Sequence, residues 1–183
     1  MGYEIALKKA WEDLVNQKAP KNLTVKFLGD EYSLDIDSRR ILSLSCNAAV
    51  KDFPAILILH YLAQKLKGLP RRSDIWLTFR EFSGIEGYYD AYHKRSIEPL
   101  IRKYGKNPDA LKDVLSRLPG RLSQGGDVSI IIEAFENVPV LIKLWKSDEE
   151  FGPDANIYFD ASIKDIFCIE DIIVLAQMVS GQL

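Results

Sequence analysis

A chain of 183 residues with 47% hydrophobic and 27% charged residues has the composition of an ordinary globular domain. Its 24 Lys and Arg against 26 Asp and Glu leave a formal charge of -2 with both signs interleaved, so nothing predicts binding to nucleic acid or to an anionic membrane surface. The longest apolar run, residues 55–63, is too short to cross a bilayer. The N-terminal segment lacks the pattern of a signal peptide. We therefore expect a cytoplasmic protein with no membrane partner.

The first third of the chain predicts a helix followed by a three-stranded meander. Residues 3–17 place an apolar stripe at helical spacing, formed by Ile5, Leu7, Trp11, Leu14 and Val15. Apolar and polar residues then alternate on both sides of Gly29-Asp30 and again over residues 39–45, which is the pattern of strands joined by tight turns.

The middle of the chain predicts helices around one strand. Residues 52–67 form a largely buried helix with Asp52 as its N-cap, and residues 75–82 have the content of a strand. Residues 88–105 return to a helix that Pro99 must kink or restart, and residues 107–118 form a further helix.

The last third predicts the centre of a sheet. Residues 127–135 and 138–145 are apolar on both pleat faces and are joined by a segment too short for a crossover helix, so we expect an antiparallel pair. A short strand over 156–160, a capping box at Ser162 and an apolar-faced helix over 169–180 complete the chain. The whole, residues 1–183, is expected to be a single α+β domain whose mostly antiparallel sheet is covered by several helices, including 52–67 and 169–180.

The second half of the chain resembles a known family. The segments IWLTFREFSGIEGYYDAYHKRSIEPL (75–100), VPVLIKLWKSDEEFGPDANIYFD (138–160) and IEDIIVLAQMV (169–179) are similar to DUF3786, an uncharacterised domain of anaerobic bacteria and archaea. The resemblance covers residues 70–183 well and the first 70 more loosely. Some relatives resemble fusions with a cysteine-rich iron–sulfur module, which implies redox or corrinoid-linked anaerobic metabolism and an iron–sulfur or corrinoid protein as partner.

Protein ligands for a metal are not predicted. Cys46 and Cys168 lie far apart and in no ligand-like spacing; the sequence leaves a disulfide between them open but favours two separate thiols. With only two histidines a zinc site is not expected, and His60, inside an apolar run, is expected to bond to backbone or to a carboxylate. Any cofactor would therefore come with a partner or a ligand, and its identity stays unknown.

A ligand site is predicted where the strand over 75–82 ends. Arg80 offers a planar fork for a carboxylate or phosphate, and the glycines that follow would let backbone amides approach a ligand. The alternative to a ligand site is a structural role, in which Arg80 pairs with a neighbouring acid and the glycines belong to an ordinary loop. Tyr88, Tyr89 and His93 could stack on a flat ligand such as a tetrapyrrole, although tyrosines packed in the core beside a solvated His93 are the favoured interpretation.

Three functional hypotheses follow. The first is a non-catalytic binding or accessory domain for an anionic or flat aromatic ligand, of tetrapyrrole or corrinoid type for example, lined by Trp76, Arg80, Tyr88, Tyr89 and Trp145. The pocket would lie between the turn over 79–89 and the acidic loop over 146–160, whose Asp148 or Glu149 could reach Arg80. The second is an enzyme of anaerobic small-molecule metabolism that uses Glu81, His93 and Asp148 for acid–base chemistry. The third is a protein-interaction domain for a redox partner, with the Tyr-rich helix and Trp145 as an exposed patch.

Overall fold

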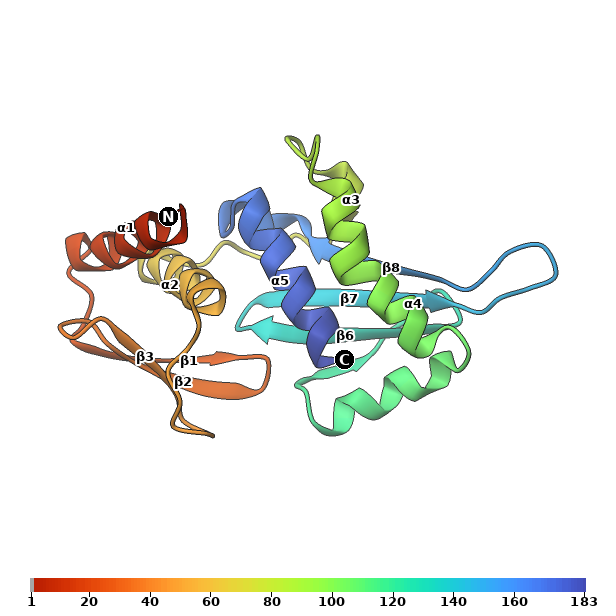
Figure 1. Ribbon diagram of the computed structural model, residues 1–183, viewed down its shortest axis with the longest axis horizontal. Coiled ribbons are helices and arrows are strands. Elements are labelled where there is room, and N and C mark those ends of the chain that lie inside the picture. The colour runs from red at the N-terminus through yellow and green to blue at the C-terminus, as the bar shows by residue number, and fades with distance from the viewer. Residues whose placement is uncertain (1) are drawn as a thin grey trace.

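The computed structural model describes residues 2–183 as an α+β fold with two antiparallel sheets and five α-helices (Figure 1). This confirms the fold class expected from the sequence. No helix among these residues has the length and apolar content needed to cross a membrane.

The N-terminal part combines two helices with the smaller sheet. Helix α1 (Gly2–Asn16) packs on α2 (Asp52–Lys67), and the sheet has the order β1-β2-β3, formed by β1 (Asn22–Phe27), β2 (Asp30–Asp35) and β3 (Arg40–Ser43). The two-residue turn between β1 and β2 has positive φ at both Leu28 and Gly29, which is the backbone shape that tight antiparallel hairpins require. The predicted meander is therefore confirmed.

The larger sheet has the order β4-β8-β7-β6-β5. Its strands are β4 (Trp76–Thr78), β5 (Gly120–Leu122), β6 (Val128–Phe135), β7 (Val138–Trp145) and β8 (Asp154–Asp160). Helix α5 (Ile169–Gln182) and the run formed by α3 (Tyr89–Tyr92), a π-helical segment (His93–Ile97) and α4 (Glu98–Tyr104) cross the same face of this sheet (Figure 1). Short 3₁₀ segments connect the rest: Phe79–Glu81, Pro108–Ser116 and Ala161–Asp165.

Strands β6 and β7 pair antiparallel near the middle of the sheet, as their apolar faces predicted. Ile130 and Ile142 are fully buried in the main core, on the face that the helices cover. Ile131 and Leu141 oppose each other, are 6% and 3% exposed, and lie outside that main core cluster. The sheet thus buries apolar residues on both pleat faces.

An aromatic stack joins the two sheets. The ring of Phe135, at the end of β6, stacks on Phe27 of β1 and on Tyr61 of α2, each with centroids 4.3 Å apart. The Tyr61 hydroxyl also donates a 3.0 Å hydrogen bond to the Glu136 carbonyl. Helix α2 therefore packs at the end of the β6–β7 hairpin and beside the smaller sheet, whereas the sequence predicted that it covers the larger sheet as α5 does.

Several local expectations were wrong. The N-cap of α2 is Lys51 with Asp52 in the first turn, and Asp160 rather than Ser162 caps the 3₁₀ segment after β8. Ile5 and Val15 are exposed because α1 packs on α2 along one side only. The predicted strand over 75–82 ends at Thr78, where Thr78 and Glu81 form a capping box that turns the chain into a 3₁₀ segment.

Further along, the helix expected over 107–118 is a 3₁₀ segment. The helix over 88–105 widens to π geometry just before Pro99, which lacks the N–H of a regular helix.

The carboxylate of Asp160, at the end of β8, ties three segments together. Its oxygens accept hydrogen bonds from the backbone N–H groups of Ser73, Asp74 and Ser162 at 2.7–3.0 Å and from the Ser73 hydroxyl at 2.9 Å. Asp160 is 2% exposed, so every one of these bonds replaces water that burial has removed. Burial alone would raise its pKa, but the hydrogen bonds outweigh burial and lower the pKa to about 2.

Replacing Ile131 by Asp should destabilise the fold strongly, because an unpaired charge would enter a buried face of the sheet. We expect a loss of more than about 2 kcal/mol in the free energy of unfolding, measured by urea denaturation. Ile5→Asp, at a position 71% exposed, is the matched control and should change stability little. Equal losses in the two variants would contradict the burial of this face.

Asp160 should make stability depend on pH in the acid range. Its folded pKa of about 2 lies below the ordinary value of 3.8, so its contribution is fully present above pH 4 and is lost as the pH falls through 2. Asp160→Asn should therefore lose roughly 2 kcal/mol of stability at pH 7 and flatten the curve between pH 4 and 2. Asp165→Asn, at a nearby exposed position, should keep the wild-type profile.

Candidate functional site

A pocket of about 350 Å³ lies where the end of β4, the π-helical segment and the start of β8 meet. Its wall is formed by Thr78, Phe79 and Arg80, by Tyr89, Tyr92, His93 and Ile97, and by Asp154, Ala155 and Asn156. The pairing of β4 with β8 and the continuous run from α3 to α4 bring these three segments together. The site thus draws on residues nearly eighty positions apart in the sequence.

Arg80 is held in place by its neighbours in the chain. The Glu81 carboxylate accepts hydrogen bonds from the Thr78 backbone N–H at 2.7 Å and from the Thr78 hydroxyl at 2.9 Å, which fixes the 3₁₀ turn that carries Arg80. These bonds, that of the backbone N–H first, lower the pKa of Glu81. The ionised carboxylate is therefore the form that makes these two bonds.

The Arg80 guanidinium stacks on an aromatic ring instead of pairing with an acid. Its Cζ atom lies 4.1 Å from the centre of the Tyr89 ring. Arg72 and Arg121 both pair with Glu133, but no such ion pair forms at Arg80 within residues 2–183. Stacking leaves the edge of the guanidinium, with its N–H donors, free to bind a carboxylate or phosphate.

Tyr92 contributes an unused polar group to the same wall. Its ring stacks on Phe79 with centroids 4.1 Å apart, and the residue is 1% exposed. Within the described part of the chain its buried hydroxyl has no hydrogen-bond partner. Burial raises the pKa of Tyr92, so the hydroxyl stays protonated and can both donate and accept.

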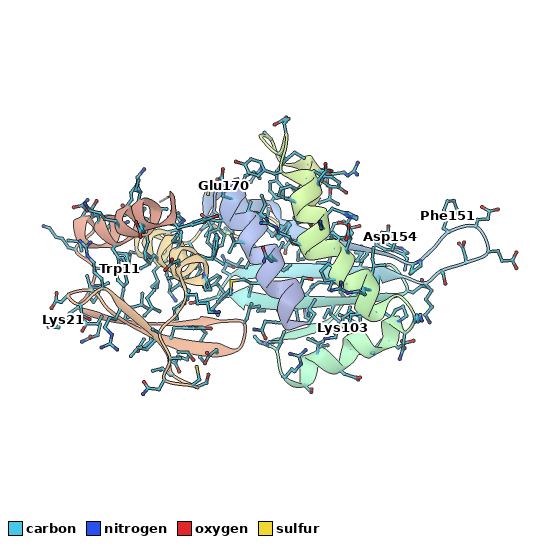
Figure 2. The ribbon with its side chains drawn as sticks, viewed as in Figure 1. Trp11, Lys21, Lys103, Phe151, Asp154 and Glu170 are labelled. Atoms are coloured by element: carbon cyan, nitrogen blue, oxygen red, sulfur yellow. The ribbon has the colours of Figure 1, made fainter. Side chains whose placement is uncertain are left out.

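His93 and Asp154 complete the polar part of the pocket. His93 is half-buried, and its Nδ1 lies 3.6 Å from the Glu98 carboxylate. Asp154 stands at the start of β8, at the base of the projecting β7–β8 loop (Figure 2). Its Oδ1 accepts the backbone N–H of Ala155 at 2.8 Å. Arg80 and Asp154 therefore place one positive and one negative group in the wall of one pocket.

Of the five predicted ligand-binding residues, Arg80 and Tyr89 line this pocket and the other three do not. Trp76 pairs with Asp160 across β4 and β8, and Trp145 pairs with Asp154 at the edge of the β7–β8 hairpin. The Tyr88 hydroxyl donates a 2.8 Å hydrogen bond to Glu170 at the start of α5. The ligand-binding role of these residues stays a prediction.

The three residues proposed for acid–base catalysis, Glu81, His93 and Asp148, lie in three different parts of the structure. Glu81 is bound within the capping box, and His93 is in the pocket wall. Asp148 accepts the backbone N–H groups of Phe151 and Glu150, which lower its pKa. It belongs to the same loop as Phe151, which projects from the molecule (Figure 2). Asp154 lines the pocket in place of the Asp148 or Glu149 that the sequence suggested.

Phe79 and Asn156 were not predicted, although both line the pocket. The signal that could have found them is strand register: Thr78 pairs with Tyr158, so the residues after β4 lie beside those at the start of β8. No group of three or more metal-ligating side chains occurs in residues 2–183, and Cys46 and Cys168 are both free thiols there.

The fold and the pocket together define an α+β domain with a polar, arginine- and tyrosine-lined cavity beside an antiparallel sheet. The chain belongs to the DUF3786 family, described as a domain of unknown function, whose model matches residues 7–182. The match includes residues 7–70, in the part of the chain where the resemblance was expected to be looser. No curated protein and no solved structure matches the chain.

Proposed function

We propose that this chain is a cytoplasmic binding or accessory domain that holds a small anionic ligand with a flat conjugated group. The observation that carries the proposal is the Arg80 guanidinium, stacked on Tyr89 and without a carboxylate partner among the described residues. An arginine that forms no ion pair with an acid of the protein can make bidentate hydrogen bonds to the carboxylate or phosphate of a ligand.

The volume of the pocket limits the ligand. At about 350 Å³ it lies at the small end of the range for small-molecule sites, so it suits a ring of benzoate size more than a complete tetrapyrrole or corrinoid. The partly exposed Tyr89 ring offers contact area for a flat group, and the buried, unbonded Tyr92 hydroxyl lies in the same wall. A setting in anaerobic metabolism, with an iron–sulfur or corrinoid protein as partner, rests on the family resemblance rather than on the pocket.

Arg80→Ala should weaken ligand binding strongly. The protein should stay folded, because the side chain is exposed and makes no ion pair among the described residues. With benzoate as the probe, followed by two-dimensional NMR, we expect the dissociation constant to rise at least about tenfold, the loss of one charge-assisted hydrogen-bonded contact. Arg102→Ala, which removes an exposed arginine of α4 outside the pocket, is the matched control and should bind as wild type does.

Inorganic phosphate, used as a second probe, separates the contribution of ligand charge to the affinity from the contribution of ring stacking. Tyr89→Leu should weaken benzoate more than phosphate, because only benzoate has a ring to stack. A large fall in the melting temperature of Arg80→Ala would show that Arg80 is structural. Equal affinities in Arg80→Ala and Arg102→Ala would refute the proposal.

Native mass spectrometry of protein purified without oxygen tests for the natural ligand. We expect a bound mass that is present in wild type and in Arg102→Ala and absent from Arg80→Ala. An absorption spectrum of the same sample reports directly on any tetrapyrrole, corrinoid or flavin. A bound mass retained by Arg80→Ala would place the ligand elsewhere on the molecule.

A further inference from the structure

A histidine and a buried carboxylate meet on the side of α5 that faces α2. His60 Nδ1 lies 2.8 Å from Asp171 Oδ2, although the two residues are 111 positions apart. The Asp171 side chain is 8% exposed and that of His60 is 36% exposed. The sequence predicted a bond from His60 to backbone or to a carboxylate, and the structure selects the carboxylate.

This contact determines which nitrogen of His60 can react. Because Asp171 accepts a hydrogen bond, the proton of the neutral imidazole resides on Nδ1 and the lone pair on Nε2. The bond to Asp171 raises the pKa of His60, against the opposing effect of burial. An imidazole oriented by a carboxylate in this way is the base-and-orienter pair found in many hydrolytic sites.

Cys168 supports Asp171 from the other side. Its thiol lies 3.2 Å from the same Oδ2 atom. Although Cys168 is an exposed residue, partial desolvation of its sulfur and then the charge of Asp171 raise the pKa of the thiol to about 12, so the sulfur remains a protonated donor at neutral pH. The thiol therefore helps to orient Asp171 and is a poor nucleophile itself.

His60 also lines open space. Two hollows, of about 250 and 560 Å³, share His60 and Asp13 as lining residues, and they lie between α1, α2 and the start of α5. The charged groups around His60 are Lys9, Glu12, Asp13, Lys67 and Asp171. Asp13 lies 3.7 Å from Lys67 and Glu12 lies 3.8 Å from Lys8, so most of these charges are balanced by neighbours.

We propose that His60 and Asp171 form a second site, in which His60 acts as a general base for the hydrolysis of small neutral esters. The balanced charge of the walls favours a neutral substrate over an anionic one. The site shares no lining residue with the Arg80 pocket, so it stands independently of the function proposed for that pocket.

The step needs only water as co-reactant. A water oxygen bonds to the ester carbonyl carbon while one of its protons moves to His60 Nε2. The carbon–oxygen bond to the alcohol then breaks, and the leaving oxygen takes that proton from Nε2. Asp171 remains ionised throughout and acts as a positioning residue, since it holds Nδ1 and stabilises the imidazolium.

Hydrolysis of 4-nitrophenyl acetate by the full chain tests the proposal. We expect multiple turnovers, at a rate at least about tenfold above that of free imidazole at the same concentration. His60→Gln should lower the rate to the background of buffer. Asp171→Asn should lower the rate and move the apparent pKa of the rate profile downward, an effect that a merely structural role would not give.

Cysteine variants distinguish a thiol from the imidazole. Cys46→Ala, which removes the other exposed thiol, should keep the wild-type rate. A rate that survives in His60→Gln but is lost in Cys168→Ala would assign the reaction to sulfur and overturn the proposal. Wild-type turnover no faster than free imidazole would overturn it as well.

An NMR titration of the wild-type imidazole needs no variant and so covers the case in which His60→Gln or Asp171→Asn fails to fold. The proposal requires a His60 pKa above 6.5 that matches the apparent pKa of the rate profile. A His60 pKa at or below 6.5 would overturn the assignment.

Discussion

The carboxylate of Asp160 is the constraint on which both parts of the site region depend. Through Ser73 and Asp74 it holds the segment that enters β4, and through Ser162 it starts the 3₁₀ turn that leads to α5. Arg80 lies in the 3₁₀ segment that directly follows β4, so the position of β4 sets its place in the pocket wall. Asp171 lies in the first turn of α5, where it contacts His60. A buried carboxylate with four donors is costly to disturb, because removing it leaves those donors without partners.

The aromatic stack of Phe27, Phe135 and Tyr61 plays a corresponding role near the same end of the larger sheet, at the β6–β7 hairpin. It fixes α2 against the β6–β7 hairpin, and His60, which contacts Asp171 of α5, is a residue of α2. The two sheets therefore share one hydrophobic core cluster even though they share no strand. This arrangement gives rigid supports to both the Arg80 pocket and the His60–Asp171 pair, as precise sites require.

Periodicity was sufficient to predict most elements but not how they meet. The bounds of α2 and the antiparallel β6–β7 pair follow from apolar spacing, which is a local property. The neighbours of Arg80 depend on the pairing of β4 with β8, about eighty residues apart, and a single sequence does not encode that register visibly. Arg80 and Tyr89 are close in sequence, so both were predicted to line the pocket. Phe79 and Asn156 were missed, and Trp145 was wrongly expected beside Arg80 and Tyr89. For His60 the sequence predicted a bond to backbone or to a carboxylate but did not identify Asp171, which lies 111 residues away in the chain.

A crystal structure of the protein purified without oxygen is the most direct test of the central claim, that the Arg80 pocket holds an anionic ligand. The account predicts electron density for a ligand in this pocket, with an anionic oxygen within hydrogen-bond distance of the Arg80 guanidinium and a planar group against Tyr89. A ligand bound elsewhere, or an Arg80 guanidinium that pairs with a carboxylate of the protein itself, would contradict it.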